Sequence, residues 1–129
     1  MDVLNEACKF LKGHPALFYK ESLNGVYVDA PDSGGFAVSL TVADGYTVAY
    51  DGWHEHFDDP YDALECFQFA FSPQCRLRVA LRGHTEYRWS MEYQTPNGWE
   101  VESTTGLLFF PFWHRPRVTY RHNHLTAAG

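Results

Sequence analysis

Large apolar side chains alternate with small or polar ones along residues 36–50, with a period of two. This alternation is the pattern of strands that bury one face. A three-residue loop at 43–45 pairs Val42 with Tyr46 and keeps both apolar sets on one face, whereas a two-residue loop would put them on opposite faces. We therefore expect a three-residue hairpin with Gly45 in the left-handed conformation, and a fold built largely of antiparallel sheet.

A second hairpin is predicted further along the chain, with its loop at 83–85. In this register the apolar residues of the two arms face one another on one side. On the other side, the register sets Arg76 opposite Glu92 and Arg82 opposite Glu86. Apolar and charge pairing thus agree on a second three-residue hairpin.

Shorter apolar runs predict further strands. Val26–Val28 fits a strand before the first hairpin, and Val118–His122 fits the last strand. A three-residue turn at 96–98 begins another strand and sets Tyr93 opposite Val101.

Two helices are predicted from helical spacing and from the residues at their ends. The first covers about 2–12, where apolar residues recur every three or four positions. The second has its N-cap at Asp58 or Asp59, has Pro60 at its first position, and stops at 72–73.

The predicted element order is helix, three strands, helix, and then three or four strands. Because nearly every connection is a hairpin, we predict an α+β fold with a mostly antiparallel sheet of six to seven strands and both helices packed on one face. The chain has 129 residues, of which 45% are hydrophobic. This is the size of one ordinary domain, so we assign residues 1–129 to a single domain.

Charge is distributed unevenly along the chain, whose formal net charge is -6. Residues 1–66 hold 12 acids and 3 lysines, whereas residues 67–129 hold 4 acids and 7 arginines. The two halves either neutralise each other within one domain or form an acidic and a basic edge used in association. The net charge, and the carboxylates expected opposite the arginines of the second hairpin, argue against nucleic-acid binding.

Other features argue against a membrane or secreted protein. The N-terminus has no signal-peptide pattern, and the longest apolar run is too short to span a bilayer. The 3 cysteines include no Cys-x-x-Cys pair, so we expect reduced and mostly buried thiols rather than a disulfide framework. These observations predict a soluble cytoplasmic protein without a membrane partner.

The segment 53–59 holds the densest group of ligand-type side chains. If it is extended, His54 and His56 point to the same side, and with Asp58 they could hold a divalent cation such as Zn²⁺. An open coordination position would then activate water for hydrolysis. The alternative, which we favour, is a polar loop whose acids cap the second helix. A second His-x-His at 122–124 could join the site, although a frayed tail is the simpler expectation. The sequence suggests no cofactor other than this divalent metal.

The tract 107–113 is apolar at every position, which suits a strand covered on both faces, but Pro111 cannot donate to a central ladder. The tract is therefore either buried as core or exposed as a surface for a protein partner or a second copy. Its candidate interface residues are Leu107, Phe109, Phe110, Phe112, Trp113 and Arg115.

Residues 51–72 and 106–113 resemble small bacterial proteins of unknown function, and the element order is similar to that of bacterial secretion-chaperone-like folds. The resemblance implies a bacterial single-domain protein and supplies no catalytic residue. No nucleophile, base and oxyanion donor can be named together. We therefore expect a non-catalytic protein-interaction or self-associating module, with a homodimer or a protein partner. The alternative is metal or small-ligand binding through His54 and His56, with hydrolysis as one form of that function.

Overall fold

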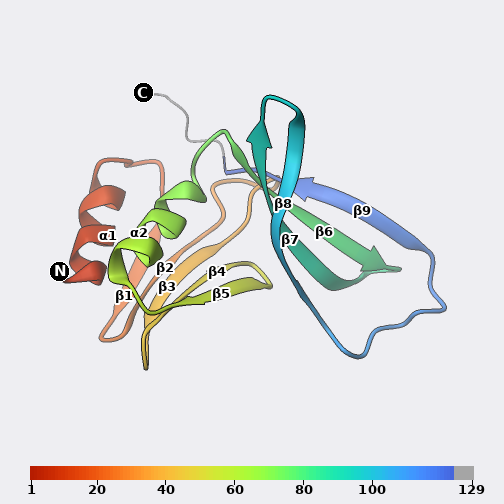
Figure 1. Cartoon of the computed structure of the whole chain (residues 1–129), viewed down its shortest axis with the longest axis horizontal. Helices are drawn as coiled ribbons and strands as arrows, with labels where there is room; N and C mark the ends of the chain where they lie inside the picture. Colours follow the sequence, from red (N-terminus) through yellow and green to blue (C-terminus); the bar gives the residue numbers. More distant parts are fainter. Residues whose placement is uncertain (124–129) are drawn as a thin grey trace.

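The structure is a computed structural model that describes residues 1–123. It is an α+β fold with two helices and two antiparallel sheets (Figure 1). The first sheet contains, in spatial order, β1 (Tyr19–Ser22), β2 (Gly25–Val28), β3 (Val38–Val42), β4 (Tyr46–Tyr50) and β5 (Trp53–Phe57). The second sheet has the order β8-β7-β6-β9 and contains β6 (Cys75–Arg82), β7 (Thr85–Thr95), β8 (Gly98–Gly106) and β9 (Pro116–Arg121). The helices are α1 (Val3–Lys12) and α2 (Pro60–Phe69).

Both helices begin where the sequence predicts. The Asp2 side chain caps α1 by accepting from the Asn5 N–H at 3.1 Å, and Asp59 caps α2 by accepting from the Tyr61 N–H at 2.7 Å, next to Pro60 in the first turn. Both helices pack on one face of the first sheet, α1 against β2 and α2 against β3, β4 and β5 (Figure 1). The predicted placement of the helices is therefore confirmed for this sheet. Neither these helices nor any other in residues 1–123 is long and apolar enough to cross a bilayer.

The prediction of one sheet with six to seven strands is wrong, because the strands divide into a five-stranded and a four-stranded sheet. Two strands were missed. β1 is polar and mostly exposed at the edge of its sheet, so no alternation marks it. β5 covers the segment that we interpreted as a capping loop, and it pairs along its whole length with β4. The sequence did not predict β5 as a strand because two of its five residues are histidines, which lie on the side of the sheet away from the helices.

The register predicted for the first hairpin is confirmed. Val42 pairs with Tyr46, Leu40 with Val48, and the same register continues to the outer ends of β3 and β4. Gly45 has a φ of 105°, in the region that favours glycine. The apolar pattern was sufficient here because a slip by one residue would have moved a whole buried face into water.

The second hairpin follows the predicted register from Cys75 to Ala80 and departs from it only next to the turn. Arg76 faces Glu92 as expected, but a register shift near the tip pairs Leu81 with Glu86, so Glu86 does not face Arg82. The loop is correspondingly shorter by one residue than predicted. A β-bulge of this kind changes the local register without changing the apolar pattern of the strands.

The turn between β7 and β8 is also shorter than predicted. Tyr93 faces Glu100 rather than Val101, because Gly98 already pairs with Thr95. Gly98 has a φ of 113°. A second register shift then leaves Glu102 of β8 without a partner residue in β7. This bulge matters for the site described below, because Glu102 lines it.

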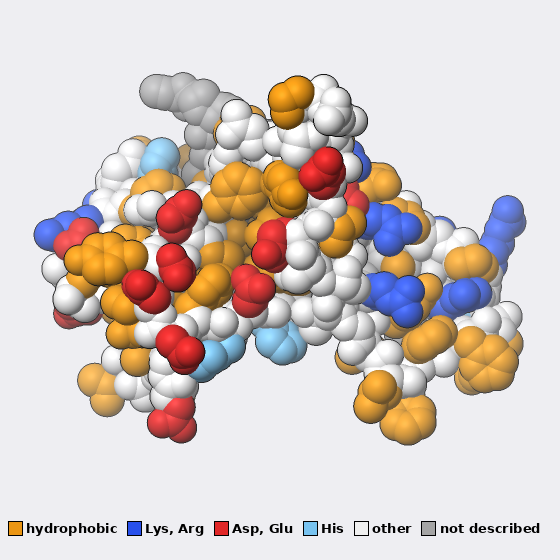
Figure 2. Space-filling model, viewed as in Figure 1, with side chains coloured by type: hydrophobic (Ala, Val, Ile, Leu, Met, Phe, Trp, Pro, Cys, Tyr) orange, Lys and Arg blue, Asp and Glu red, His pale blue; other side chains and the backbone are white. Residues whose placement is uncertain are grey.

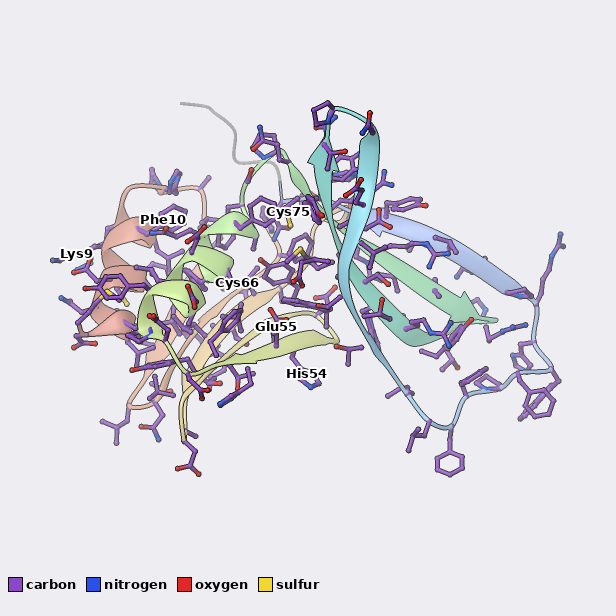
Figure 3. All side chains as sticks on the ribbon, viewed as in Figure 1. Lys9, Phe10, His54, Glu55, Cys66 and Cys75 are labelled. Carbon is purple, nitrogen blue, oxygen red and sulfur yellow. The ribbon has the colours of Figure 1, made fainter. Side chains whose placement is uncertain are left out.

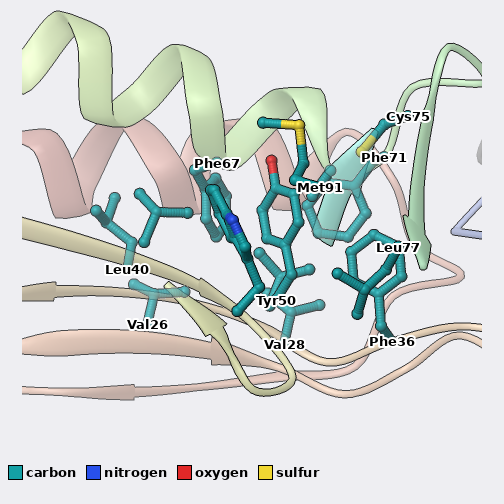
Figure 4. Close-up of a cluster of buried hydrophobic side chains, with 14 of the residues drawn as sticks. Val26, Val28, Phe36, Leu40, Tyr50, Phe67, Phe71, Cys75, Leu77 and Met91 are labelled. Carbon is teal, nitrogen blue, oxygen red and sulfur yellow. The ribbon is translucent and has the colours of Figure 1, made fainter. Parts of the chain in front are cut away.

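One hydrophobic cluster includes side chains from both sheets and both helices. In Figure 4, Leu77 and Met91 of the second sheet lie beside Tyr50 of the first sheet and Phe36, which precedes β3, below α2. The indole N–H of Trp53, which is fully buried, donates to Ser103 Oγ at 2.9 Å and so joins β5 to β8. The two sheets are therefore held together by shared core packing and by direct hydrogen bonds.

Candidate functional site

The apolar tract that follows β8 is exposed. Leu108 and Phe109 expose 91% and 90% of their surface, and Phe112 and Trp113 expose 69% and 71%. Leu107 is also exposed, at 48%. The interpretation of the tract as buried core is therefore wrong. We call residues 107–115 the aromatic loop.

The base of the aromatic loop is attached to the tip of the β6–β7 hairpin. The Phe110 ring stacks on the Tyr87 ring with centroids 4.3 Å apart, and the Leu107 N–H donates to the Tyr87 carbonyl at 2.8 Å. The Arg82 guanidinium donates to the carbonyls of Phe112 and His114, each at 3.4 Å. The exposed side chains are thus carried on a loop whose backbone is already positioned.

The remaining predicted interface residue, Arg115, lies at the end of the aromatic loop. Its side chain is exposed, and its carbonyl accepts from the Gly83 N–H at 3.1 Å. Gly83 has a φ of 62°, and a Cβ at this position would meet the ring of His114. Glycine is therefore needed where the loop crosses the hairpin tip.

The predicted metal ligands lie on the solvent side of the first sheet. In β5, His54 and His56 are exposed and share one side of the strand, and Figure 3 shows His54 pointing away from α2. His56 Nε2 lies 3.5 Å from Asp58 Oδ1. Within residues 1–123, no group of three or more His, Cys, Asp and Glu side chains is placed to hold a metal ion. The structure brings two of the three residues together, and metal binding stays a prediction.

The second His-x-His segment is only partly described. His122 lies near the Trp99 ring, with centroids 6.1 Å apart, and His124 lies outside the described residues. Between them, Asn123 is almost fully buried. Its burial was not predicted from the sequence.

The opposite side of β5 faces a cleft that the sequence did not predict. The cleft has a volume of about 670 Å³ and lies between α2, β5 and the β7–β8 hairpin. Its acidic lining residues are Glu55, Asp62, Glu65 and Glu102, and its other lining residues include Phe57, Phe69, Met91 and Tyr93. We call it the acidic cleft. Figure 2 shows red acidic side chains around an orange apolar area at the centre of this face.

Residues from two distant parts of the chain form the acidic cleft, which is why sequence reasoning missed it. Positions 55–69 supply one wall and positions 91–102 supply the other. The one available signal was the alternation in β5. If His54 and His56 face solvent, Glu55 must face the helix side.

Glu55 has the most perturbed carboxyl group in the acidic cleft. Partial burial raises the pKa of Glu55, and the negative charge of Glu102 raises it further. No hydrogen bond or ion pair within residues 1–123 compensates for this cost. The cleft therefore holds negative charge that its own residues do not neutralise.

The three cysteines are free, and burial makes their thiols unreactive. Desolvation raises the pKa of Cys66, at the edge of the acidic cleft, to about 12, and raises that of Cys8 to about 11. Burial also raises the pKa of Cys75. Since the thiolate is the nucleophile, none of these groups is activated for covalent chemistry. The prediction that the thiols are mostly buried is confirmed, since Cys8 and Cys75 are buried and Cys66 is half-buried.

Arg76 of the predicted basic face is engaged within the second sheet. Its Nε lies 2.6 Å from Glu92 Oε1, and its guanidinium lies over the rings of Trp99 and Tyr120, at 4.4 Å and 4.1 Å from their centroids. Such an arginine is held by stacking and by its carboxylate partner. The expectation that nucleic acid is not a partner stays a prediction.

Comparisons of the chain with protein-family models, with curated proteins and with solved structures found no match.

Proposed function

We propose that this chain is a non-catalytic interaction module that self-associates through the aromatic loop. The observation that supports the proposal is the exposure of Leu108 and Phe109, at 91% and 90%. Contiguous apolar surface of this kind is unusual on a monomer and typical of an interface. Aromatic residues with a neighbouring arginine, here Trp113 and Arg115, are also enriched in the energetically important parts of interfaces.

A second copy is the partner that best fits the surroundings of the loop. The aromatic loop continues into β9, which is an edge strand of the second sheet, and Val118 and Tyr120 on this strand are exposed at 42% and 44%. An edge strand can pair with the same strand of another copy about a two-fold axis.

The proposal is tested by a double substitution, Leu108→Ser with Phe109→Ser, followed by light scattering coupled to size-exclusion chromatography. We expect the unmodified protein to be a dimer and the variant to be a folded monomer. The monomer should remain folded, because neither side chain is buried in the chain itself.

A matched control is available elsewhere on the chain. Phe18 and Leu23 expose 75% and 92% of their surface, and they flank β1 in the other sheet. Phe18→Ser with Leu23→Ser should leave the dimer intact. A monomeric unmodified protein at the highest attainable concentration, or a Leu108→Ser/Phe109→Ser variant that stays dimeric, contradicts the proposal.

A further inference from the structure

We propose that the acidic cleft binds a small organic cation, an amine or guanidinium group carried on an apolar body. The proposal is independent of the aromatic loop, which contributes no residue to the cleft. A volume of about 670 Å³ lies within the range of roughly 300–1,000 Å³ that is usual for small-molecule sites. The site is open on one side, so a ligand would enter without displacing an element of the fold.

The charge of the ligand follows from the lining. Four carboxylates surround the acidic cleft, and its lining contains no lysine, arginine or histidine. None of the four carboxylates has a hydrogen bond or ion pair to another side chain within residues 1–123. A cation in the cleft would therefore gain attraction from all four groups, whereas an anion would be repelled.

The chemical nature of the ligand follows from the walls. Phe57 and Phe69 come from one side of the acidic cleft, and Met91 and Tyr93 come from the other. Aromatic rings and a thioether favour an apolar body, and ring faces also attract an ammonium or guanidinium group. A bare metal ion would leave this apolar surface unused. The walls therefore favour an organic cation over a metal ion.

The position of the cationic group follows from the electrostatics. Glu55 is the partly buried carboxylate of the acidic cleft, and its pKa is raised by desolvation and by Glu102. A bound cation next to this pair would relieve both effects, because it favours the ionised form of each carboxylate. We therefore place the cationic end of the ligand between Glu55 and Glu102, with the apolar body directed toward Phe69 and Met91.

Three compounds that share the same apolar body but differ in charge distinguish the contribution of charge to binding from that of hydrophobic contact. The probe is 4-phenylbutylamine, compared with the neutral 4-phenylbutan-1-ol and the anionic 4-phenylbutyrate, each titrated into the whole chain and followed by chemical shifts. We expect saturable shifts of the Met91 methyl group with the amine. The alcohol should bind roughly tenfold more weakly, and the acid should not bind measurably.

Matched substitutions complete the test. Glu55→Gln should weaken amine binding by roughly tenfold, since it removes the charge of the partly buried carboxylate. Glu21→Gln makes the same charge change on β1, outside the acidic cleft, and should leave binding unchanged. If Glu55→Gln fails to fold, Glu65→Gln at an exposed position of α2 replaces it.

Four outcomes would overturn the proposal. These are equal binding of the amine and the alcohol, equal effects of the cleft substitution and Glu21→Gln, no saturable binding of the amine, and binding of spermidine as tight as that of the amine. The first would indicate an apolar patch without charge recognition, and the last would indicate charge attraction without a role for the apolar walls.

Discussion

At the scale of single residues, a close contact between the two sheets is made possible by a missing side chain. Gly52 lies in the turn between β4 and β5, and a Cβ at this position would overlap the indole ring of Trp89. Trp89 itself is 9% exposed and belongs to the shared core. The φ of Gly52 is not positive, so its backbone conformation does not require glycine. Glycine is needed at this position because a side chain would not fit beside Trp89.

Gly52→Ala should therefore destabilise the chain. We expect a loss of about 1–3 kcal/mol in the free energy of unfolding, because the indole ring or the turn must shift to accept a methyl group. Denaturant titration monitored by tryptophan fluorescence measures the loss. Gly106→Ala is the matched control, since its Cβ would meet its nearest neighbour at an ordinary 3.6 Å. Equal stability of the two variants would show that Trp89 does not need the space.

At the scale of elements, the register shift in the β6–β7 hairpin changes the partner of Glu86. Instead of facing Arg82, Glu86 accepts from Arg121 of β9, with Oε2 2.7 Å from Nη2. Arg121 also lies 2.6 Å from Asp51, in the turn between β4 and β5. One guanidinium thus joins β7, β9 and the first sheet. The hydrogen bond from Arg121 lowers the pKa of Glu86, and that from Trp89 adds to the effect.

The lowered pKa of Glu86 predicts a pH-dependent contribution to stability. A carboxyl group whose pKa is lower in the folded state stabilises the fold above its unfolded pKa, and the contribution is lost as the pH falls through the folded value. Arg121→Met should therefore cost about 1–2 kcal/mol at neutral pH, allowing for the partial exposure of the ion pair. The difference from the unmodified protein should shrink below about pH 4.

Denaturant titrations between neutral and acidic pH check this expectation. Arg78→Met is the matched control, because Arg78 lies on β6 and has no ion pair within the described residues. Its stability relative to the unmodified protein should not vary with pH. A constant difference for Arg121→Met over the whole pH range would show that Glu86 is not its energetic partner.

The same elements show what the sequence could predict. Apolar alternation indicated the register of β3 and β4 because a slip would expose a buried face, apolar spacing indicated α1, and the capping residues indicated the start of α2. The registers near the turns of the second sheet could not be predicted, since a bulge changes pairing while leaving the alternation of each strand intact. β1 carries no alternation, and β5 carries histidines on its exposed side.

The candidate sites were predictable to different degrees. The aromatic loop was visible in the sequence as an apolar tract, but the pattern did not show that Phe110 packs on Tyr87 while Leu108 and Phe109 stay exposed. The acidic cleft depends on the docking of two sheets and on the bulge that frees Glu102. Neither condition is encoded in a local pattern, so the cleft could not be found before the fold was known.

At the scale of the whole molecule, the end of the described chain is fixed to the first sheet. Asn123 follows β9, and its side chain makes two hydrogen bonds with the backbone of Phe36, accepting from the N–H and donating to the carbonyl, each at 2.8 Å. Asn123 is 1% exposed. A buried amide with both groups satisfied is costly to replace, because any change leaves a backbone group without its partner.

Asn123→Asp should test this connection. The aspartate can still accept from the Phe36 N–H, but an ionised carboxylate cannot donate to the Phe36 carbonyl and would be buried. Burial raises the pKa of this carboxyl group in the folded state, so the variant should be least impaired at acidic pH and lose stability as the pH rises. At neutral pH we expect a loss of about 2–4 kcal/mol.

The control for this substitution is Asn97→Asp, at an exposed position in the turn between β7 and β8. It makes the same chemical change where the side chain is not buried, and its stability should stay close to that of the unmodified protein from pH 4 to pH 8. Thermal unfolding over this pH range distinguishes the two variants. If Asn123→Asp follows Asn97→Asp, the chain end is not held in the core, and the contacts that attach the first sheet to the second are those of Trp53, His54, Arg121 and the shared apolar cluster.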